Sequence, residues 1–189
     1  MARQVLFVQG GGGKNAHDEW DSKLVEGLER ELGPEYEIRY PRMPNEEDPK
    51  YASWKTALRS ELDMLDDGAI LVAHSIGATI VAHSLAEDPP RRAPVGIFLV
   101  SMPFIGKDGW PGGDIKPDTE LGSKLPQQSS IYLYQGSEDE IVPLEHVRLN
   151  AKAIPQAVVR TLSGRDHQLD NDMTEVAADI RNLIIEKQV

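Results

Sequence analysis

The sequence contains no cysteine among its 189 residues. This absence excludes disulfide bonds, metal sites built on thiolates and a cysteine nucleophile. Long hydrophobic runs are also missing, and the apolar stretch 5–8 near the start is too short for a signal peptide. Because a membrane-spanning helix needs about 20 apolar residues, we expect a cytoplasmic protein without a membrane segment.

Basic residues are scarce relative to acidic ones. Lysine and arginine number 20 against 31 aspartate and glutamate residues, which gives a formal net charge of −11. Nucleic acids and anionic membrane surfaces attract clustered positive charge, and the sequence has no basic cluster beyond Arg91-Arg92. Neither is therefore expected as a partner. The five histidines lack the His-Glu-x-x-His type of spacing, and no metal or cofactor is expected.

What the sequence does contain is a regular alternation of patterns. Hydrophobic residues make up 40% of the chain, and at this length one domain spanning 1–189 is expected. Short apolar runs predict strands at 5–8, 36–40, 69–73, 95–100, 131–134 and 157–162. Apolar residues at helical spacing, beginning with Trp20, predict helices at 20–32, 51–65, 78–86, 144–153 and 173–186. The pattern predicts a three-layer α/β/α sandwich around a mostly parallel sheet of about six strands.

One long stretch, 101–129, shows no clear secondary-structure pattern. Irregular loops of this length are often lids or binding loops, but a simple surface excursion explains the stretch equally well. Its aromatic residues Phe104 and Trp110 are candidates for substrate contacts, with core packing as the alternative. We expect 101–129 to act as a lid or substrate loop.

The most informative motif is Ala73-His74-Ser75-Ile76-Gly77, which joins an apolar strand to a helix. A strand, a sharp turn with serine at its tip and a helix form a nucleophile elbow, with small residues two before and two after the serine. The alternative is a buried strand followed by a helix with a capping serine. His74 adjoins the nucleophile and is expected to pack beside the sheet or to contact substrate.

Two later loops supply the partners that a serine nucleophile needs. Asp139 follows the strand predicted at 131–134, and His167 follows the strand predicted at 157–162. A serine hydroxyl needs a histidine to accept its proton, and the histidine needs a carboxylate to orient it. Serine, acid and histidine occur here in the order of the α/β-hydrolases. We predict a Ser75-His167-Asp139 triad, although Glu138 and Glu140 flank the chosen acid.

Backbone N–H groups that stabilise an oxyanion are expected from Ile76 and from the glycine run after the first strand. By position, Gly11 is the expected second donor and Gly12 its rival, with Gly12 also a candidate substrate contact. The same run fails as a phosphate-binding P-loop, which needs glycine where Val8 stands. It fails as a dinucleotide fingerprint because Asn15 replaces the last glycine.

Together these motifs make the chain resemble the small α/β-hydrolases of the retinoblastoma-binding-protein type and their bacterial relatives. Many relatives carry histidine where this chain has Gln9. The resemblance implies a sheet of about six strands without a large cap domain. It also implies hydrolysis of a small-molecule ester or related acyl compound through Ser75, Asp139 and His167. Carboxylesterase activity is favoured over thioesterase, amidase or acyltransferase activity, and the alternative function is a non-catalytic binding protein of the same fold.

Overall fold

The computed structural model describes residues 2–186, in which six strands form one parallel sheet. The strand order is β2-β1-β3-β4-β5-β6. The strands are β1 (Arg3–Val8), β2 (Tyr36–Arg39), β3 (Ile70–His74), β4 (Gly96–Val100), β5 (Ser130–Gly136) and β6 (Val158–Leu162). Every residue of β3 and β4 is buried, as continuous apolar runs predict for central strands covered on both faces. All six predicted strands are confirmed.

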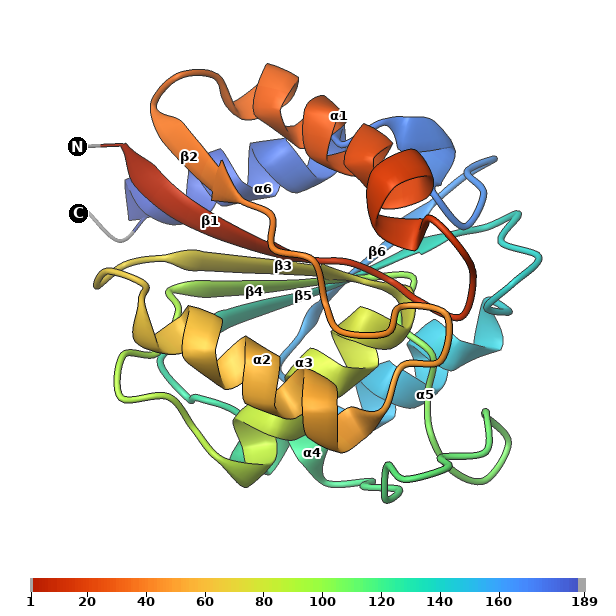
Figure 1. Ribbon diagram of the computed structural model, residues 1–189. Helices are drawn as coiled ribbons and strands as arrows, with labels where there is room; N and C mark the ends of the chain where they lie inside the picture. Colours follow the sequence, from red (N-terminus) through yellow and green to blue (C-terminus); the bar gives the residue numbers. More distant parts are fainter. Residues whose placement is uncertain (1, 187–189) are drawn as a thin grey trace.

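Helices cover both faces of the sheet, as Figure 1 shows. One face carries α1 (Ser22–Leu32) and α6 (Thr174–Glu186), and the other carries α2 (Tyr51–Asp63), α3 (Ser75–Glu87) and α5 (Glu145–Ala153). Each face has its own hydrophobic core. Since α1 follows β1 and α3 follows the adjacent β3, the chain leaves these neighbouring strands toward opposite faces. Open α/β sheets bind ligands at such a switch point, which lies here at the carboxyl ends of β1 and β3.

The helix predicted at 20–32 begins later than expected. A π-helical turn (Ala16–Asp21) precedes α1, and its wider winding moves its side chains off the face that α-helical spacing predicts. Trp20 is therefore 51% exposed and does not join the apolar face of the helix. Asp21 takes the inward position instead and is 1% exposed.

The segment 101–129 is packed into the molecule along much of its length. Its apolar residues Ile105, Ile115, Leu121 and Leu125 belong to the core on the α2 and α3 side. It also contains a short helix, α4 (Leu121–Lys124), which the sequence did not predict. Four residues give too short a periodic pattern to be recognised. These contacts make the segment part of the core, and its expected role as lid or substrate loop stays a prediction.

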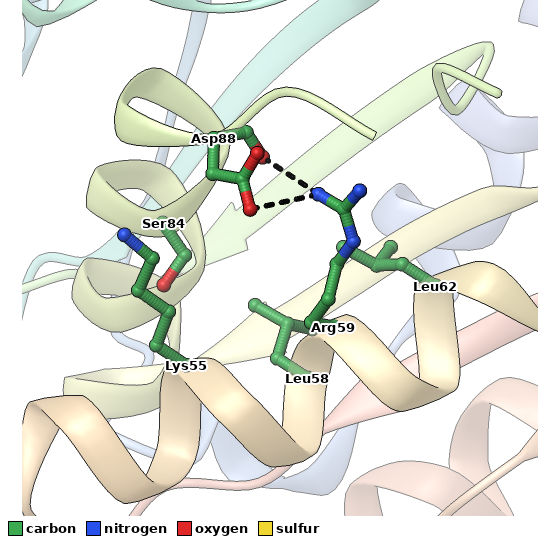
Figure 2. A pocket seen from close by; sticks show the side chains of 6 residues that line it. All are labelled: Lys55, Leu58, Arg59, Leu62, Ser84 and Asp88. Carbon is green, nitrogen blue, oxygen red and sulfur yellow. Dashed lines mark hydrogen bonds and ion pairs between the residues drawn. The ribbon is translucent and has the colours of Figure 1, made fainter. Parts of the chain in front are cut away.

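Side chains from α2 and α3 close a small pocket on the same face (Figure 2). The guanidinium of Arg59 reaches the carboxylate of Asp88 at 2.9 Å, and Lys55 and Ser84 stand beside it. The pocket holds about 10 Å³, close to the smallest space that admits one water molecule. It is too small for a substrate.

The start of β1 and the end of α6 lie on the side of the sheet away from the carboxyl ends of the strands. β1 begins and α6 ends at the same edge, on the left in Figure 1, whereas the strands run toward the right. A Cβ added to Gly96, the first residue of β4, would contact Leu183 near the end of α6. None of the helices in the described part of the chain combines the length and the apolarity that crossing a membrane requires.

Candidate active site

Ser75 occupies a strained position at the end of β3. It is the first residue of α3 and has φ of +53°, a left-handed conformation that costs a non-glycine residue of order 1 kcal/mol or more. Two residues later, a Cβ at Gly77 would overlap the carbonyl oxygen of Gln9. Only glycine fits there, because the elbow packs directly against the loop after β1. The strand, turn and helix predicted around Ser75 are confirmed.

The structure brings the three predicted triad residues into one hydrogen-bonded chain. The Nε2 atom of His167 lies 3.0 Å from Oγ of Ser75, and its Nδ1 atom lies 2.8 Å from Oδ2 of Asp139. A carboxylate only accepts hydrogen bonds, so Nδ1 carries a proton and Nε2 is left to accept the serine proton. Ser75 is 6% exposed, and the side chain of His167 is 15% exposed. The arrangement is buried but reachable.

Among the three adjacent acids, the structure turns only Asp139 inward. Its Oδ1 atom accepts the N–H groups of Ile141 and Val142, both at 2.8 Å, and Oδ2 accepts Nε2 of Gln135 at 2.7 Å besides His167. Burial alone raises the pKa of Asp139, but the hydrogen bonds from His167 and the two backbone groups outweigh it and lower the pKa. Asp139 is thus held ionised beside the histidine.

In the glycine loop after β1, two backbone N–H groups are already bonded within the protein. The Gly10 N–H donates to Oδ2 of Asp21 at 2.6 Å, and the Gly12 N–H donates to the carbonyl of Glu46 at 2.8 Å. Between residues 2 and 186, no hydrogen bond engages the Gly11 N–H. The N–H of Ile76 lies in the first turn of α3, where backbone donors have no acceptor inside the helix. The role of Ile76 and Gly11 as oxyanion donors stays a prediction.

Gln9, which stands where many relatives of the resembled family carry histidine, holds this loop in place. Its Nε2 atom donates to the Glu46 carboxylate at 2.7 Å, and its Oε1 atom accepts the N–H of Met43 at 3.0 Å. Both ends of the amide are therefore used to join the glycine loop to the loop after β2. Gly12, at the exposed outer side of this loop, has φ of +96°.

His74 is buried and does not take the accessible position that a substrate contact needs. Its side chain is 2% exposed, and its two ring nitrogens lie within 3.1 Å of Asp21 and of the His167 carbonyl. The expectation that it lies beside the sheet holds, but it is a buried polar residue and not a packing residue. Asp21 is the residue that the sequence reasoning missed, since nothing in an amphipathic stretch marks one aspartate as inward-facing.

Phe104 and Trp110 gather around His146 of α5. The Phe104 N–H donates to Nδ1 of His146 at 2.9 Å, and the Trp110 ring meets the His146 ring edge-on with centroids 6.0 Å apart. Phe104 is 7% exposed. No hydrogen bond or ring contact found in the described residues joins Phe104 or Trp110 to the triad, so their role as substrate contacts stays a prediction. No cluster of metal ligands occurs within residues 2–186.

Solved structures with the same fold include small bacterial hydrolases. The ydeN gene product of Bacillus subtilis matches with a TM-score of 0.73 and 21% identity, covering 96% of this chain and 100% of that one. A Xanthomonas campestris α/β serine hydrolase described as having no lid matches with a TM-score of 0.65 and 14% identity, covering 98% and 83%. The predicted α/β-hydrolase fold without a large cap domain is confirmed.

Comparison with curated proteins finds a partial similarity to human integrin alpha-10. The two are 26% identical over 107 residues, which are 54% of this chain but only 9% of the integrin. This chain therefore spans a small fraction of that protein's length.

A family model gives the more extensive match. The model described as serine hydrolase aligns with residues 5–170, a range that runs from β1 past His167 and includes Ser75 and Asp139. The chain belongs to the serine hydrolase family.

Proposed function

We propose that this protein hydrolyses an ester or related acyl bond through Ser75, His167 and Asp139. The observation that carries the proposal is the continuous path from Ser75 Oγ to His167 Nε2 at 3.0 Å, and from His167 Nδ1 to Asp139 Oδ2 at 2.8 Å. A binding protein of this fold has no use for a strained serine joined to an oriented histidine. The resemblance to the retinoblastoma-binding-protein type, and a cytoplasmic location, are part of the same proposal.

The geometry supports a mechanism in two steps. Ser75 Oγ attacks the acyl carbon while His167 Nε2 takes the hydroxyl proton, and the N–H groups of Ile76 and Gly11 stabilise the oxyanion. The oxyanion collapses, the bond to the leaving group breaks, and His167 returns its proton to that group. A water molecule then gives a proton to His167 as its oxygen attacks the acyl carbon. The bond from that carbon to Ser75 Oγ breaks, His167 returns the proton to Oγ, and the acid is released. Asp139 keeps the ring oriented throughout.

Small-molecule esters are the substrates that we favour. Thioester or amide hydrolysis and acyl transfer are the less favoured activities. Two structural neighbours support this order. Est1E from Butyrivibrio proteoclasticus, solved with ferulic acid, matches with a TM-score of 0.66 and 15% identity over 98% of this chain and 89% of that one. A monoacylglycerol lipase from Paleococcus ferrophilus matches with a TM-score of 0.69 and 14% identity over 96% and 93%.

A fluorophosphonate probe tests the proposal directly. The wild-type protein is expected to be labelled on Ser75, and Ser75→Ala is expected to abolish both labelling and hydrolysis of p-nitrophenyl esters. Ser84→Ala is the matched control, since Ser84 is another buried serine of α3 that lies outside the proposed triad. Equal labelling of Ser75→Ala and the wild type would refute the proposal. A series of esters of increasing chain length, beside thioester and peptide substrates, would then define the substrate class.

A further inference from the structure

A second histidine–carboxylate pair lies directly behind the triad. Nδ1 of His74 lies 2.9 Å from Oδ1 and 3.0 Å from Oδ2 of Asp21, and both side chains are 2% exposed. Nε2 of His74 lies 3.1 Å from the backbone carbonyl oxygen of His167. The mechanism above uses neither His74 nor Asp21.

The contacts of His74 determine its protonation state. A carboxylate and a carbonyl oxygen are both acceptors, whereas a neutral imidazole has one N–H group. Both contacts are hydrogen bonds only when the ring carries two protons. Burial alone lowers the pKa of His74, but the charge of Asp21 and the hydrogen bonds to Asp21 and His167 outweigh it and raise the pKa. The pair is then an imidazolium buried against a carboxylate.

The pair joins the end of β3 to the loops that follow two other strands. Asp21 also accepts the N–H of Gly10 at 2.6 Å, in the loop after β1, and Nε2 of Gln168 at 3.3 Å, in the loop after β6. His74 is the last residue of β3 and holds the backbone of His167. Space at Gly10 is tight, because a Cβ there would approach Cβ of Ser75 at 3.1 Å and Nδ1 of His74 at 3.2 Å.

We propose that His74 and Asp21 form a positioning pair for the hydrolysis proposed above: doubly protonated His74 fixes the backbone of His167, and Asp21 fixes the oxyanion loop through Gly10. The inference rests on that proposed function. Neither residue touches the reacting atoms. The pair sets the distance between the base, the nucleophile and the oxyanion donors, and misplacement by about 1 Å can lower a rate by roughly 10²-fold.

The protonation state is tested on the wild-type protein by ¹⁵N NMR of its histidine rings. The His74 resonances are assigned by their loss in His74→Gln. The expected result is that both ring nitrogens of His74 are protonated at pH 7.5. A neutral ring with one protonated nitrogen would overturn the inference, and this measurement does not depend on catalysis.

The positioning role is tested by steady-state kinetics with a p-nitrophenyl ester. Asp21→Asn removes the charge that keeps His74 doubly protonated, so kcat is expected to fall by about 10²-fold, with KM little changed because Asp21 is buried. His74→Gln is expected to have a similar effect. The double variant is expected to be no worse than either single variant, because residues that act as a unit are non-additive.

Asp179→Asn is the matched control for loss of a buried carboxylate. Asp179 is 8% exposed and bonds Arg160 at 3.0 Å and Tyr134 at 2.7 Å, in contacts that involve no proposed catalytic residue. Its loss is expected to lower Tm while leaving kcat unchanged. A folded Asp21→Asn with wild-type kcat would overturn the positioning role, as would purely multiplicative effects in the double variant. Absence of probe labelling in the wild type would instead refute the proposed hydrolase function and leave the NMR result standing.

Discussion

Replacement of Asp139 by asparagine tests the geometry of the triad atom by atom. Every partner of this carboxylate is a donor: two backbone N–H groups face Oδ1, and Gln135 Nε2 and the His167 ring face Oδ2. Asparagine has one oxygen and one NH₂ group. The oxygen belongs opposite the two fixed backbone donors, so the NH₂ group faces Gln135 and His167.

The consequence for His167 is the wrong tautomer. Its Nδ1 atom must accept a hydrogen bond from the new NH₂ group, so the proton moves to Nε2, which then cannot take the proton of Ser75. The same change in serine triads on other folds lowers kcat by about 10⁴-fold, or roughly 5.5 kcal/mol of barrier. The fold tolerates the change, because Gln135 can turn its amide and present Oε1, which has no partner in the described structure. Losing the bond from Gln135 to Val142 costs about 1–3 kcal/mol of stability.

Hydrolysis of p-nitrophenyl acetate measures kcat, and urea unfolding measures the stability of the same samples. Glu138→Gln and Glu140→Gln are matched controls, since both carboxylates are exposed, and both variants are expected to keep wild-type kcat. The reasoning is refuted if Asp139→Asn keeps more than about a tenth of wild-type kcat, against the 10⁴-fold loss expected. It is equally refuted if one of the two controls loses activity to the extent expected of Asp139→Asn.

Three further predictions concern stability, each measured by chemical denaturation. Gly77→Ala is expected to destabilise the protein by about 1–3 kcal/mol or more, because the added Cβ would overlap the Gln9 carbonyl. Leu121→Ala is expected to cost about 2–5 kcal/mol, since Leu121 is 2% exposed in the core; a negligible cost would mean that 101–129 is detachable. Burial alone raises the pKa of Asp21. The charge and hydrogen bond of His74 outweigh this effect, so the pKa of Asp21 lies below its usual value of 3.8. The stability from Asp21 is therefore expected above pH 3.8, and it should be lost as the pH falls through the lower folded-state pKa; unchanged urea midpoints from pH 5 to pH 2 would contradict this.

Much of the fold was predictable because its patterns are local. Continuous apolar runs such as Ile70–His74 mark central parallel strands, and residues at helical spacing mark the helices between them. The elbow was predictable for the same reason, since Ser75 and the small residues around it are adjacent in the sequence. The order of serine, aspartate and histidine along the chain then pointed to the loops after β5 and β6.

The remaining features depend on contacts between distant residues. Asp139, and not Glu138 or Glu140, turns inward because the N–H groups of Ile141 and Val142 and the Gln135 side chain receive it. The sequence alone does not indicate which of these three acids faces inward.

The pairing of Asp21 with His74 crosses 53 positions of the chain. It depends on the π-helical turn before α1, which exposes Trp20 and buries Asp21. Helical periodicity alone predicts the reverse orientation for these two neighbours, because a π-helical turn has no distinct pattern in a single sequence.

The position of the start of β1 and the end of α6 has a practical consequence for how this protein is handled. β1 begins and α6 ends on the side of the sheet where the strands begin, opposite their carboxyl ends. The five residues of β3 alone separate these two sides by about 17 Å. Attachment next to the start of β1 or the end of α6 is therefore expected to leave Ser75 accessible. Protein immobilised next to the end of α6 is expected to keep the kcat/KM of the free protein, even toward acyl groups carried on bulky polymers.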